Sequence, residues 1–222
     1  MTVMQARLTK VSLCVVVLFV ASGFAQVVNI PVMNPSFEEL PDGGLPFDCS
    51  GLPGCHFSAG VGIPDWTTVG SAGQLRPGPL GPHRPFGTLP AGGGITNAYS
   101  NGGTISQVVG TVQEGQFYRL TVDLGFRHDA DFTSSADLLV GGIQYMAIGD
   151  TPPRGTFYTW DATFFGTDAN VGDTITIQLN SSGVQGNFDD IRLTSEPVPE
   201  PSSMLLLGSG VLGLAQLLRR RL

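Results

Sequence analysis

The chain has 222 residues, a formal net charge of −7 and only 13% charged residues. Residues 26–198 contain no Lys, and six Arg stand against 17 Asp and Glu, so the net charge of this stretch is −11. Nucleic-acid binding needs basic patches that neutralise phosphates, so this charge balance argues against a nucleic-acid partner. At about 170 residues, the stretch is long enough to form one domain with a buried core.

The first 25 residues are organised as a secretory signal peptide. A basic start with Arg7 and Lys10 precedes a short apolar run, and small residues then lead to Ala25. A membrane anchor is the alternative, but the apolar run is short for a bilayer span. We therefore expect residues 1–25 to be removed on export and the mature chain to begin near Gln26.

Two cysteines of the mature chain, Cys49 and Cys55, enclose a short loop that contains Gly and Pro. An even number of closely spaced cysteines in an exported chain indicates a local disulfide. A metal or redox pair is the alternative, but two Cys with His56 beside them do not complete a zinc site. We expect a disulfide that shapes the loop more than it stabilises the domain, because the closed loop is short.

The mature chain shows short β-rich runs and no sustained helical period. In 117–124 and in 173–179, apolar and polar residues alternate, and the runs are separated by turns rich in Gly, Asn, Asp and Pro. This pattern is typical of an all-β sandwich. We expect further strands at 28–33, 95–100, 104–109, 136–147, 156–165 and 187–194. Residues 41–94 are crowded with Gly and Pro, and we expect long surface loops there with one short strand around Trp66.

A series of short motifs resembles the galactose-binding-like jelly roll found in carbohydrate-binding modules. The motifs are Asn-Pro-Ser-Phe-Glu at 34–38, Ile-Pro-Asp-Trp at 63–66, and the runs 103–109, 115–120 and 187–193. The resemblance extends over about residues 28–195. It implies one jelly-roll β-sandwich across residues 26–195, with the first and last strands close together.

Carboxylates stand at both ends of this expected domain, as Glu38 with Glu39 and as Asp189 with Asp190. Oxygen-rich clusters of this kind suit Ca²⁺, which accepts irregular geometry. In the resembled modules a structural calcium ion lies between the corresponding Glu and a last-strand Asp, which implies Glu38 and Asp190 as ligands here. The alternatives are solvated strand-end charges or acceptors of backbone N–H groups. A catalytic carboxylate pair is disfavoured, because no substrate-shaped motif accompanies these residues.

Five aromatic residues could stack on a sugar, because pyranose C–H faces pack on aromatic rings: Trp66, Trp160, Tyr99, Tyr158 and Phe126. Most of them are expected in the core, and Trp66, in a Pro-flanked loop, is the candidate exposed platform. The alternative is that Trp66 plugs the edge of the sandwich. A hydrolase is disfavoured, because residues 26–195 contain no G-x-S-x-G nucleophile elbow. The histidines lie in or next to expected loops, where a solvated side chain is the default.

The C-terminal residues 196–222 have three parts: a Pro-rich stretch with Pro199, Glu200 and Pro201, an apolar run, and three terminal Arg before Leu222. The basic cluster favours a cytoplasmic end by the positive-inside rule. This arrangement resembles the PEP-CTERM sorting signal, which implies processing near Pro-Glu-Pro by a membrane-embedded exosortase. It also implies a transient anchor in the inner membrane through a transmembrane helix. An ordinary tail-anchor helix is the alternative.

These observations predict an exported, exosortase-sorted protein of the cell envelope or extracellular matrix. We expect it to be non-enzymatic and to bind or lie within exopolysaccharide, with a structural Ca²⁺. A carbohydrate-active enzyme or lectin-like adhesin with a defined sugar site is the first alternative. A structural protein that associates only with copies of itself is the second.

Overall fold

The structure is a computed structural model that describes residues 26–49, 52–78, 89–183 and 185–198, together with 208–210, 213 and 219. The expected signal peptide and the Pro-Glu-Pro motif lie outside the described residues. The expected sorting helix lies mostly outside them, and residues 208–210, 213 and 219 are helical. The described part of the chain has no helix with the length and hydropathy of a membrane span.

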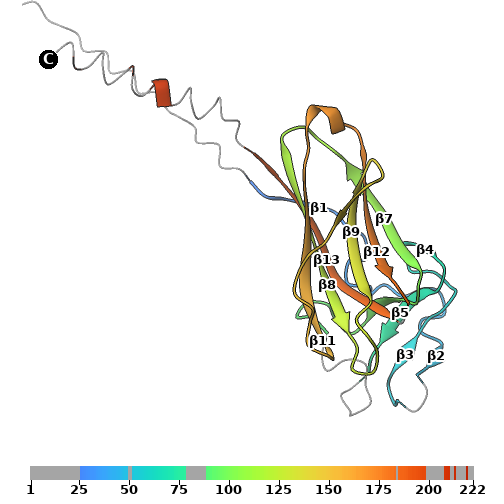
Figure 1. The fold of residues 1–222 in the computed structure, drawn as a ribbon. Coiled ribbons are helices and arrows are strands. Elements are labelled where there is room, and N and C mark those ends of the chain that lie inside the picture. The colour runs from blue at the N-terminus through green and yellow to red at the C-terminus, as the bar shows by residue number, and fades with distance from the viewer. Residues whose placement is uncertain are drawn as a thin grey trace, which may run out of the picture.

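Two antiparallel sheets pack face to face in a jelly-roll sandwich, which confirms the expected all-β fold (Figure 1). The eight-stranded sheet has the order β11-β8-β13-β6-β5-β3-β2 with β1 paired to β13, and the five-stranded sheet has the order β10-β9-β12-β7-β4. The elements are β1 (Val28–Ile30), β2 (Phe47–Asp48), β3 (His56–Phe57), β4 (Thr67–Val69), β5 (Ala72–Arg76), β6 (Asn97–Ser100), β7 (Thr104–Thr111), β8 (Gln116–Phe126), β9 (Ser134–Val140), β10 (Ile143–Met146), β11 (Thr156–Phe165), the 3-10 helix η1 (Asp168–Asn170), β12 (Thr174–Ser181) and β13 (Gly186–Pro197).

The core lies between the two sheets and is filled by alternate residues of each strand. In β8, Leu120, Val122 and Leu124 are fully buried, and in β12 Ile177 and Leu179 are fully buried. Each strand places successive side chains on opposite faces, so the residues between these point away from the core. The alternation predicted for both strands is therefore confirmed.

The region 41–94 differs from the expected long loops, because it contains four strands. β2 and β3 have two residues each, which is too short to show any alternation. β5 is a buried strand, and its Gly73 lies so close to β3 that a Cβ there would stand 2.1 Å from the Ser58 carbonyl oxygen. Only a small residue fits at this close approach. Because glycine is uncommon inside strands, Gly73 makes the sequence of β5 look less like a strand.

The expected single strand at 136–147 is instead a hairpin of β9 and β10. Gly141 and Gly142 form its two-residue turn, with φ of +55° and +85°. Glycine adopts this left-handed backbone without a steric penalty, as the tight hairpin turns require. The remaining expected strands are present with ends that differ by a few residues.

Candidate functional site

The outer face of the eight-stranded sheet, opposite the core, carries polar and aromatic side chains in register. Thr159 of β11, Asp123 of β8 and Asp189 of β13 are Cα partners across three neighbouring strands. Tyr99 of β6 is the partner of Asn187. Because partners share a face of the sheet, these five residues form one continuous surface.

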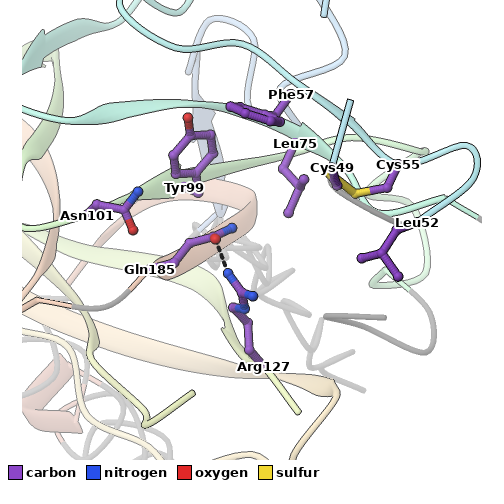
Figure 2. Close-up of a pocket in the computed structure, with 9 residues that line it drawn as sticks. All are labelled: Cys49, Leu52, Cys55, Phe57, Leu75, Tyr99, Asn101, Arg127 and Gln185. Carbon is purple, nitrogen blue, oxygen red and sulfur yellow. Dashed lines mark hydrogen bonds between the residues drawn. A yellow bond between two sulfur atoms is a disulfide. The ribbon is translucent and has the colours of Figure 1, made fainter. Parts of the chain in front are cut away.

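A pocket of about 260 Å³ lies on this outer face, where the disulfide loop covers the sheet (Figure 2). Most of its wall is apolar, and three polar side chains complete it. The lining residues are Cys49, Leu52, Cys55, Phe57, Leu75, Tyr99, Asn101, Arg127 and Gln185. A concave, mostly apolar wall with a few converging polar groups is the usual form of a small-molecule site.

The aromatic side of the pocket is held rigidly. Tyr99 is 5% exposed, and its hydroxyl donates a hydrogen bond of 2.7 Å to the Ser58 carbonyl. Burial raises the pKa of Tyr99, so the hydroxyl stays protonated and keeps this bond at physiological pH. The ring of Phe57 packs edge-on against Tyr99 at 6.4 Å between centroids. The two rings therefore form a pre-organised apolar wall.

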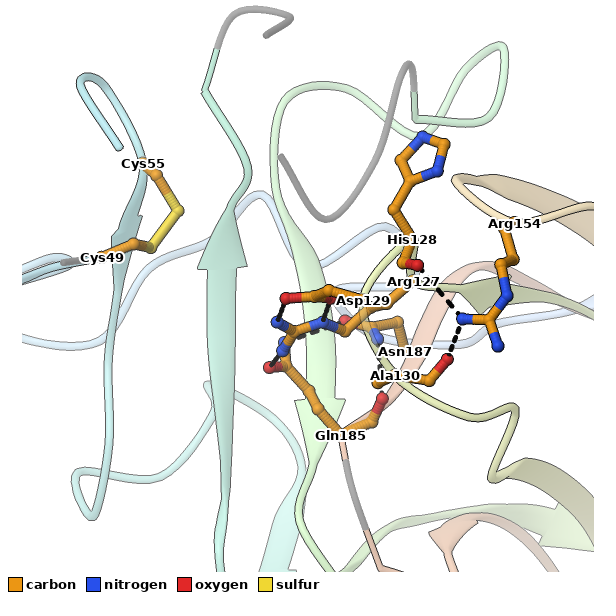
Figure 3. Close-up of polar contacts among 9 residues, drawn as sticks. All are labelled: Cys49, Cys55, Arg127, His128, Asp129, Ala130, Arg154, Gln185 and Asn187. Atoms are coloured by element: carbon orange, nitrogen blue, oxygen red, sulfur yellow. Dashed lines mark hydrogen bonds and ion pairs between the residues drawn. A yellow bond between two sulfur atoms is a disulfide. The ribbon is translucent and has the colours of Figure 1, made fainter. Parts of the chain in front are cut away.

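The polar side of the pocket is a connected network (Figure 3). Arg127 donates from Nε and Nη2 to the two carboxylate oxygens of Asp129, at 2.8 and 2.7 Å, and from Nη1 to Gln185 Oε1. Gln185 Nε2 donates to Asn187 Oδ1, which also accepts from Asn97 Nδ2. The hydrogen bonds from Arg127 hold the pKa of Asp129 below its usual value. The guanidinium is thus fixed in orientation and its charge is compensated.

A second arginine positions the loop that carries Arg127 and Asp129. The Nη1 of Arg154 donates to the carbonyls of His128 and Ala130, and its guanidinium carbon lies 4.6 Å from the centroid of the Phe126 ring (Figure 3). These contacts stabilise the turn after β8. Arg154 therefore acts on the pocket indirectly, by holding the segment from which Arg127 projects.

The structure joins Cys49 and Cys55 in the expected disulfide, with an S–S distance of 2.01 Å and a Cα–Cα distance of 5.3 Å. Cys49 N donates to the Cys55 carbonyl at 3.0 Å and Leu52 N donates to the Cys49 carbonyl at 3.0 Å, which closes the loop into a compact turn. Both cysteines line the pocket. The sequence indicated that the disulfide shapes its loop, but not that this loop is one wall of a pocket.

Neither cysteine should react with an alkylating reagent in natively recovered protein before reduction. Cys55 is fully buried and both thiols are consumed in the disulfide. Mass spectrometry with and without prior reduction measures this. Full alkylation without reduction would contradict the disulfide and restore the metal or free-thiol alternatives.

The structure places Asp189, the neighbour of the predicted ligand Asp190, close enough to Glu38 for the two carboxylates to interact. A Cβ on Gly93 would stand 2.3 Å from Asp189 Oδ2, and one on Gly94 would stand 2.4 Å from Glu38 Oε1. The loop that contains these two glycines therefore passes directly over both carboxylates. Only residues without a side chain allow this approach, so the loop and the carboxylates form a cradle.

The two carboxylates have different environments. Glu38 Oε1 accepts from Ile95 N, Thr96 N and Thr96 Oγ1 at 2.8, 2.7 and 2.6 Å. Asp189 is fully buried, its Oδ1 accepts from Asp190 N at 2.8 Å, and its Oδ2 has no hydrogen-bond partner among the described residues. Burial, together with the nearby charges of Asp190, Asp123 and Glu38, raises the pKa of Asp189 to about 9. An unpartnered buried carboxylate oxygen is costly, and a cation would satisfy it.

Asp190 itself lies in a bulge of β13, and its assignment as a ligand stays a prediction. The register between β13 and β8 shifts between Asp189 and Arg192, and Asp190 has a φ of +46°. Its carboxylate accepts a hydrogen bond from Arg192 Nη2. Phe188 and Ile191 are both buried although they are three positions apart, which a regular strand does not allow and the bulge explains. The described residues contain no group of three or more His, Cys, Asp or Glu placed to hold a metal, so a cation here would depend on two carboxylates and neutral oxygens.

The structure contradicts Trp66 as an exposed platform. Its side chain is 6% exposed, its Nε1 donates to the Asn34 carbonyl at 3.2 Å, and its ring packs against Phe37 at 5.4 Å. Trp66 therefore packs into the edge of the sandwich, as the alternative interpretation of the sequence expected. The aromatic residues at the pocket are instead Tyr99, one of the five aromatic residues considered from the sequence, and Phe57, which the sequence did not single out.

Comparisons with known proteins agree with this architecture. The family model described as HpiC1 cyclase matches residues 28–194, and the PEP-CTERM protein-sorting motif matches residues 197–221. No curated protein shows a significant match to the chain.

Two solved structures are similar to the chain to different degrees, and the first of them supports the fold. The apo form of a cyclase from Fischerella sp. is similar with a TM-score of 0.61 and 20% identity, covering 78% of this chain and 98% of that one. The xylan-binding domain from Paenibacillus barcinonensis is more distant, with a TM-score of 0.37 and 11% identity, covering 65% of this chain and 94% of that one.

The sorting motif identifies an exported protein that is directed to the cell envelope and handled by an exosortase-type system. The domain before it is matched along almost its whole length by one family model. The chain therefore belongs to the HpiC1-like cyclase family and carries this domain in front of a PEP-CTERM sorting motif.

Proposed function

We propose that the domain is a non-enzymatic extracellular module that holds one neutral sugar residue of an exopolysaccharide in the pocket on the outer face. The pocket carries this proposal, because it places two fixed aromatic rings opposite a hydrogen-bonding network in about 260 Å³. This volume lies just below the usual range of about 300–1,000 Å³ for drug-sized ligands. A single sugar ring is a ligand of suitable size.

The chemistry of the wall supports a sugar. Phe57 and Tyr99 offer apolar ring faces for the C–H groups of a pyranose. Asn101, Gln185 and Arg127 offer donors and acceptors for its hydroxyls. The Arg127 charge is compensated by Asp129 at 2.7 Å, and the net charge of residues 26–198 is −11. Both features disfavour an anionic ligand and favour a neutral one.

Isothermal titration of the mature domain with neutral and acidic exopolysaccharide fragments tests this function. We expect binding of neutral fragments, and we expect Phe57→Ala to weaken it by about tenfold, since an aromatic contact contributes about 0.5–1.5 kcal/mol beyond its buried area. Arg127→Ala should also weaken binding. Phe165→Ala is the matched control, because Phe165 is 46% exposed and does not line the pocket.

A domain that binds no neutral fragment would contradict the proposal. Equal affinity of the Phe57→Ala variant and the unmodified domain would place the sugar elsewhere.

A Ca²⁺ ion between Glu38 and Asp189 belongs to the same proposal. The unpartnered Asp189 Oδ2 and the glycine cradle support it, since oxygen ligands in an irregular arrangement are what calcium accepts. Such an ion would compensate the repulsion between the buried carboxylates and hold the loop over β13. It would stabilise the fold and take no direct part in binding sugar.

An enzymatic cyclase is the second candidate, favoured by the family and by the raised pKa of Asp189. A carboxyl group that stays protonated at neutral pH can donate a proton. Asp189 is fully buried, however, so a substrate could reach it only after the loop around Gly93 moved. If Asp189→Asn abolishes a ring-closing activity of the domain while sugar binding persists, the domain is an enzyme and the leading proposal is wrong about its activity.

A further inference from the structure

The last strand of the fold continues directly into the sorting motif. β13 runs to Pro197, and Val198 N donates to the Gly115 carbonyl at 2.9 Å. The Pro-Glu-Pro sequence begins at the next residue, Pro199. The expected Pro-rich spacer from residue 196 therefore begins inside the sheet, and the described chain leaves no unpaired residue before the motif.

β13 is paired on both sides as far as Ser195, and its last two residues, Glu196 and Pro197, pair with β8 alone. Ser195 is the Cα partner of Tyr118 in β8 and of Val28 in β1, and Pro197 is the partner of Gln116. Because Val198 N bonds to the Gly115 carbonyl, the neighbouring pair of Pro197 and Gln116 is at a non-hydrogen-bonded position. A proline, which lacks an N–H group, fits this position without losing a ladder bond.

A cleft that bound this segment as an extended peptide would use the same backbone groups that the sheet uses. Clefts that bind peptides commonly hold several residues in an extended conformation through main-chain hydrogen bonds. The N–H of Val198 is bonded to Gly115 in the folded domain, so it cannot serve both partners at once. Strand ends open locally at a far lower cost than global unfolding. Val198 is 43% exposed, so it lies where such opening begins.

We propose that the segment Glu196–Val198 is shared between two partners: it pairs with β8 in the folded domain and is released from β8 to pair with the exosortase-type sorting enzyme. Processing at the motif then depends on opening of this strand end. The folded domain holds the segment before its sorting motif against β8, and the sorting enzyme captures the form in which this segment is released. The inference does not depend on the sugar-binding proposal.

A cross-link between the strands tests this inference in cells that contain the sorting enzyme. The full chain with Gln116→Cys and Pro197→Cys should form a disulfide, because non-hydrogen-bonded pairs bring side chains close. Pulse-chase labelling should show that the cross-linked chain loses its tail about tenfold more slowly or not at all, since the cross-link prevents local opening. A flexible Gly-Ser spacer inserted between Val198 and Pro199 of the same variant should restore processing.

Three controls make the result specific. Arg119→Cys with Thr163→Cys links β8 to β11 and leaves β13 free, so processing should be unchanged. Each single-cysteine variant should also be processed normally. The same spacer inserted between Gly141 and Gly142, a turn in the other sheet, should not restore processing of the cross-linked chain.

Processing of the cross-linked chain at the unmodified rate would overturn the inference, because the enzyme would then act without strand release. Failure of the spacer at Pro199 to restore processing would overturn it as well. A spacer that slows processing of the chain without the cross-link would show instead that the enzyme docks on the end of the folded domain.

Discussion

Chelation of calcium should lower the melting temperature of the mature domain by about 5–10 °C, and added Ca²⁺ should restore it. A ligand that binds only the native state stabilises it by about 2.7 kcal/mol at a hundredfold excess over Kd. For a domain of this size, each kcal/mol shifts the melting temperature by about 2–4 °C. Mg²⁺ should restore stability poorly, because it requires tighter octahedral geometry. Differential scanning calorimetry measures each condition.

The metal-free domain should also lose stability as the pH rises from 5 to 8. Burial raises the pKa of Asp189 to about 9, whereas the carboxyl group of an unfolded Asp has its ordinary pKa of 3.8. Between these values the folded state binds more protons than the unfolded state, so the free energy of unfolding falls with rising pH. Burial also raises the pKa of Asp123 and of Asp137, which adds to the same trend. Calcium should flatten the pH dependence, because it stabilises the ionised carboxylate.

Two neighbouring variants form a matched test of the ligand assignment. Asp189→Asn should abolish the calcium response, whereas Asp190→Asn should retain it, because the Asp190 carboxylate is paired with Arg192. The opposite result would restore the assignment made from the sequence. An unchanged melting curve in chelator, with no calcium in elemental analysis, would contradict the metal site and leave the sugar proposal intact.

Replacing Trp66 by Ala should destabilise the domain by about 3–5 kcal/mol, the usual cost of removing a large buried aromatic side chain. Its ring is 6% exposed and packs on Phe37, and its loss would leave a cavity at the sandwich edge. The Asn34 carbonyl would also lose the hydrogen bond from Trp66 Nε1. Urea unfolding followed by circular dichroism gives the free energy of unfolding.

Tyr158→Ala is the control for this substitution. Tyr158 is an aromatic residue of β11 with 44% exposure, so its removal should change stability by less than about 1 kcal/mol. If Trp66→Ala left stability unchanged and weakened sugar binding, Trp66 would be a binding platform after all.

Local sequence patterns were sufficient to predict the long strands and insufficient to predict the short ones. Alternation in β8 and β12 repeats over enough residues to show which face is buried, so both strands were predictable. β2 and β3 contain two residues each and depend on pairing with β5, which no local window can show. The turn at Gly141 and Gly142 was visible in the sequence, but the apolar residues on both sides suggested one continuous strand.

The candidate site was only partly predictable, because its residues come from distant parts of the chain. Arg127 and Gln185 are 58 positions apart and meet only because β8 and β13 are neighbours. Glu38 was singled out by its motif, and the buried carboxylate that the structure places near it is Asp189, one position before the predicted Asp190. A bulge shifts the side-chain register by one residue, and a motif alone does not show where the bulge lies.

The course of β13 separates the pocket from the sorting motif. Gln185 lies just before the first residue of this strand, and Pro197 is its last. Twelve residues of extended chain cover about 40 Å, so the two lie at opposite ends of the sandwich (Figure 1). A domain held at its C-terminal end would thus point its pocket outward. The length of the sandwich would separate the pocket from the point of attachment. A polymer bound in the pocket would lie far from the processing enzyme, so binding of a ligand and processing at the motif would not interfere with each other.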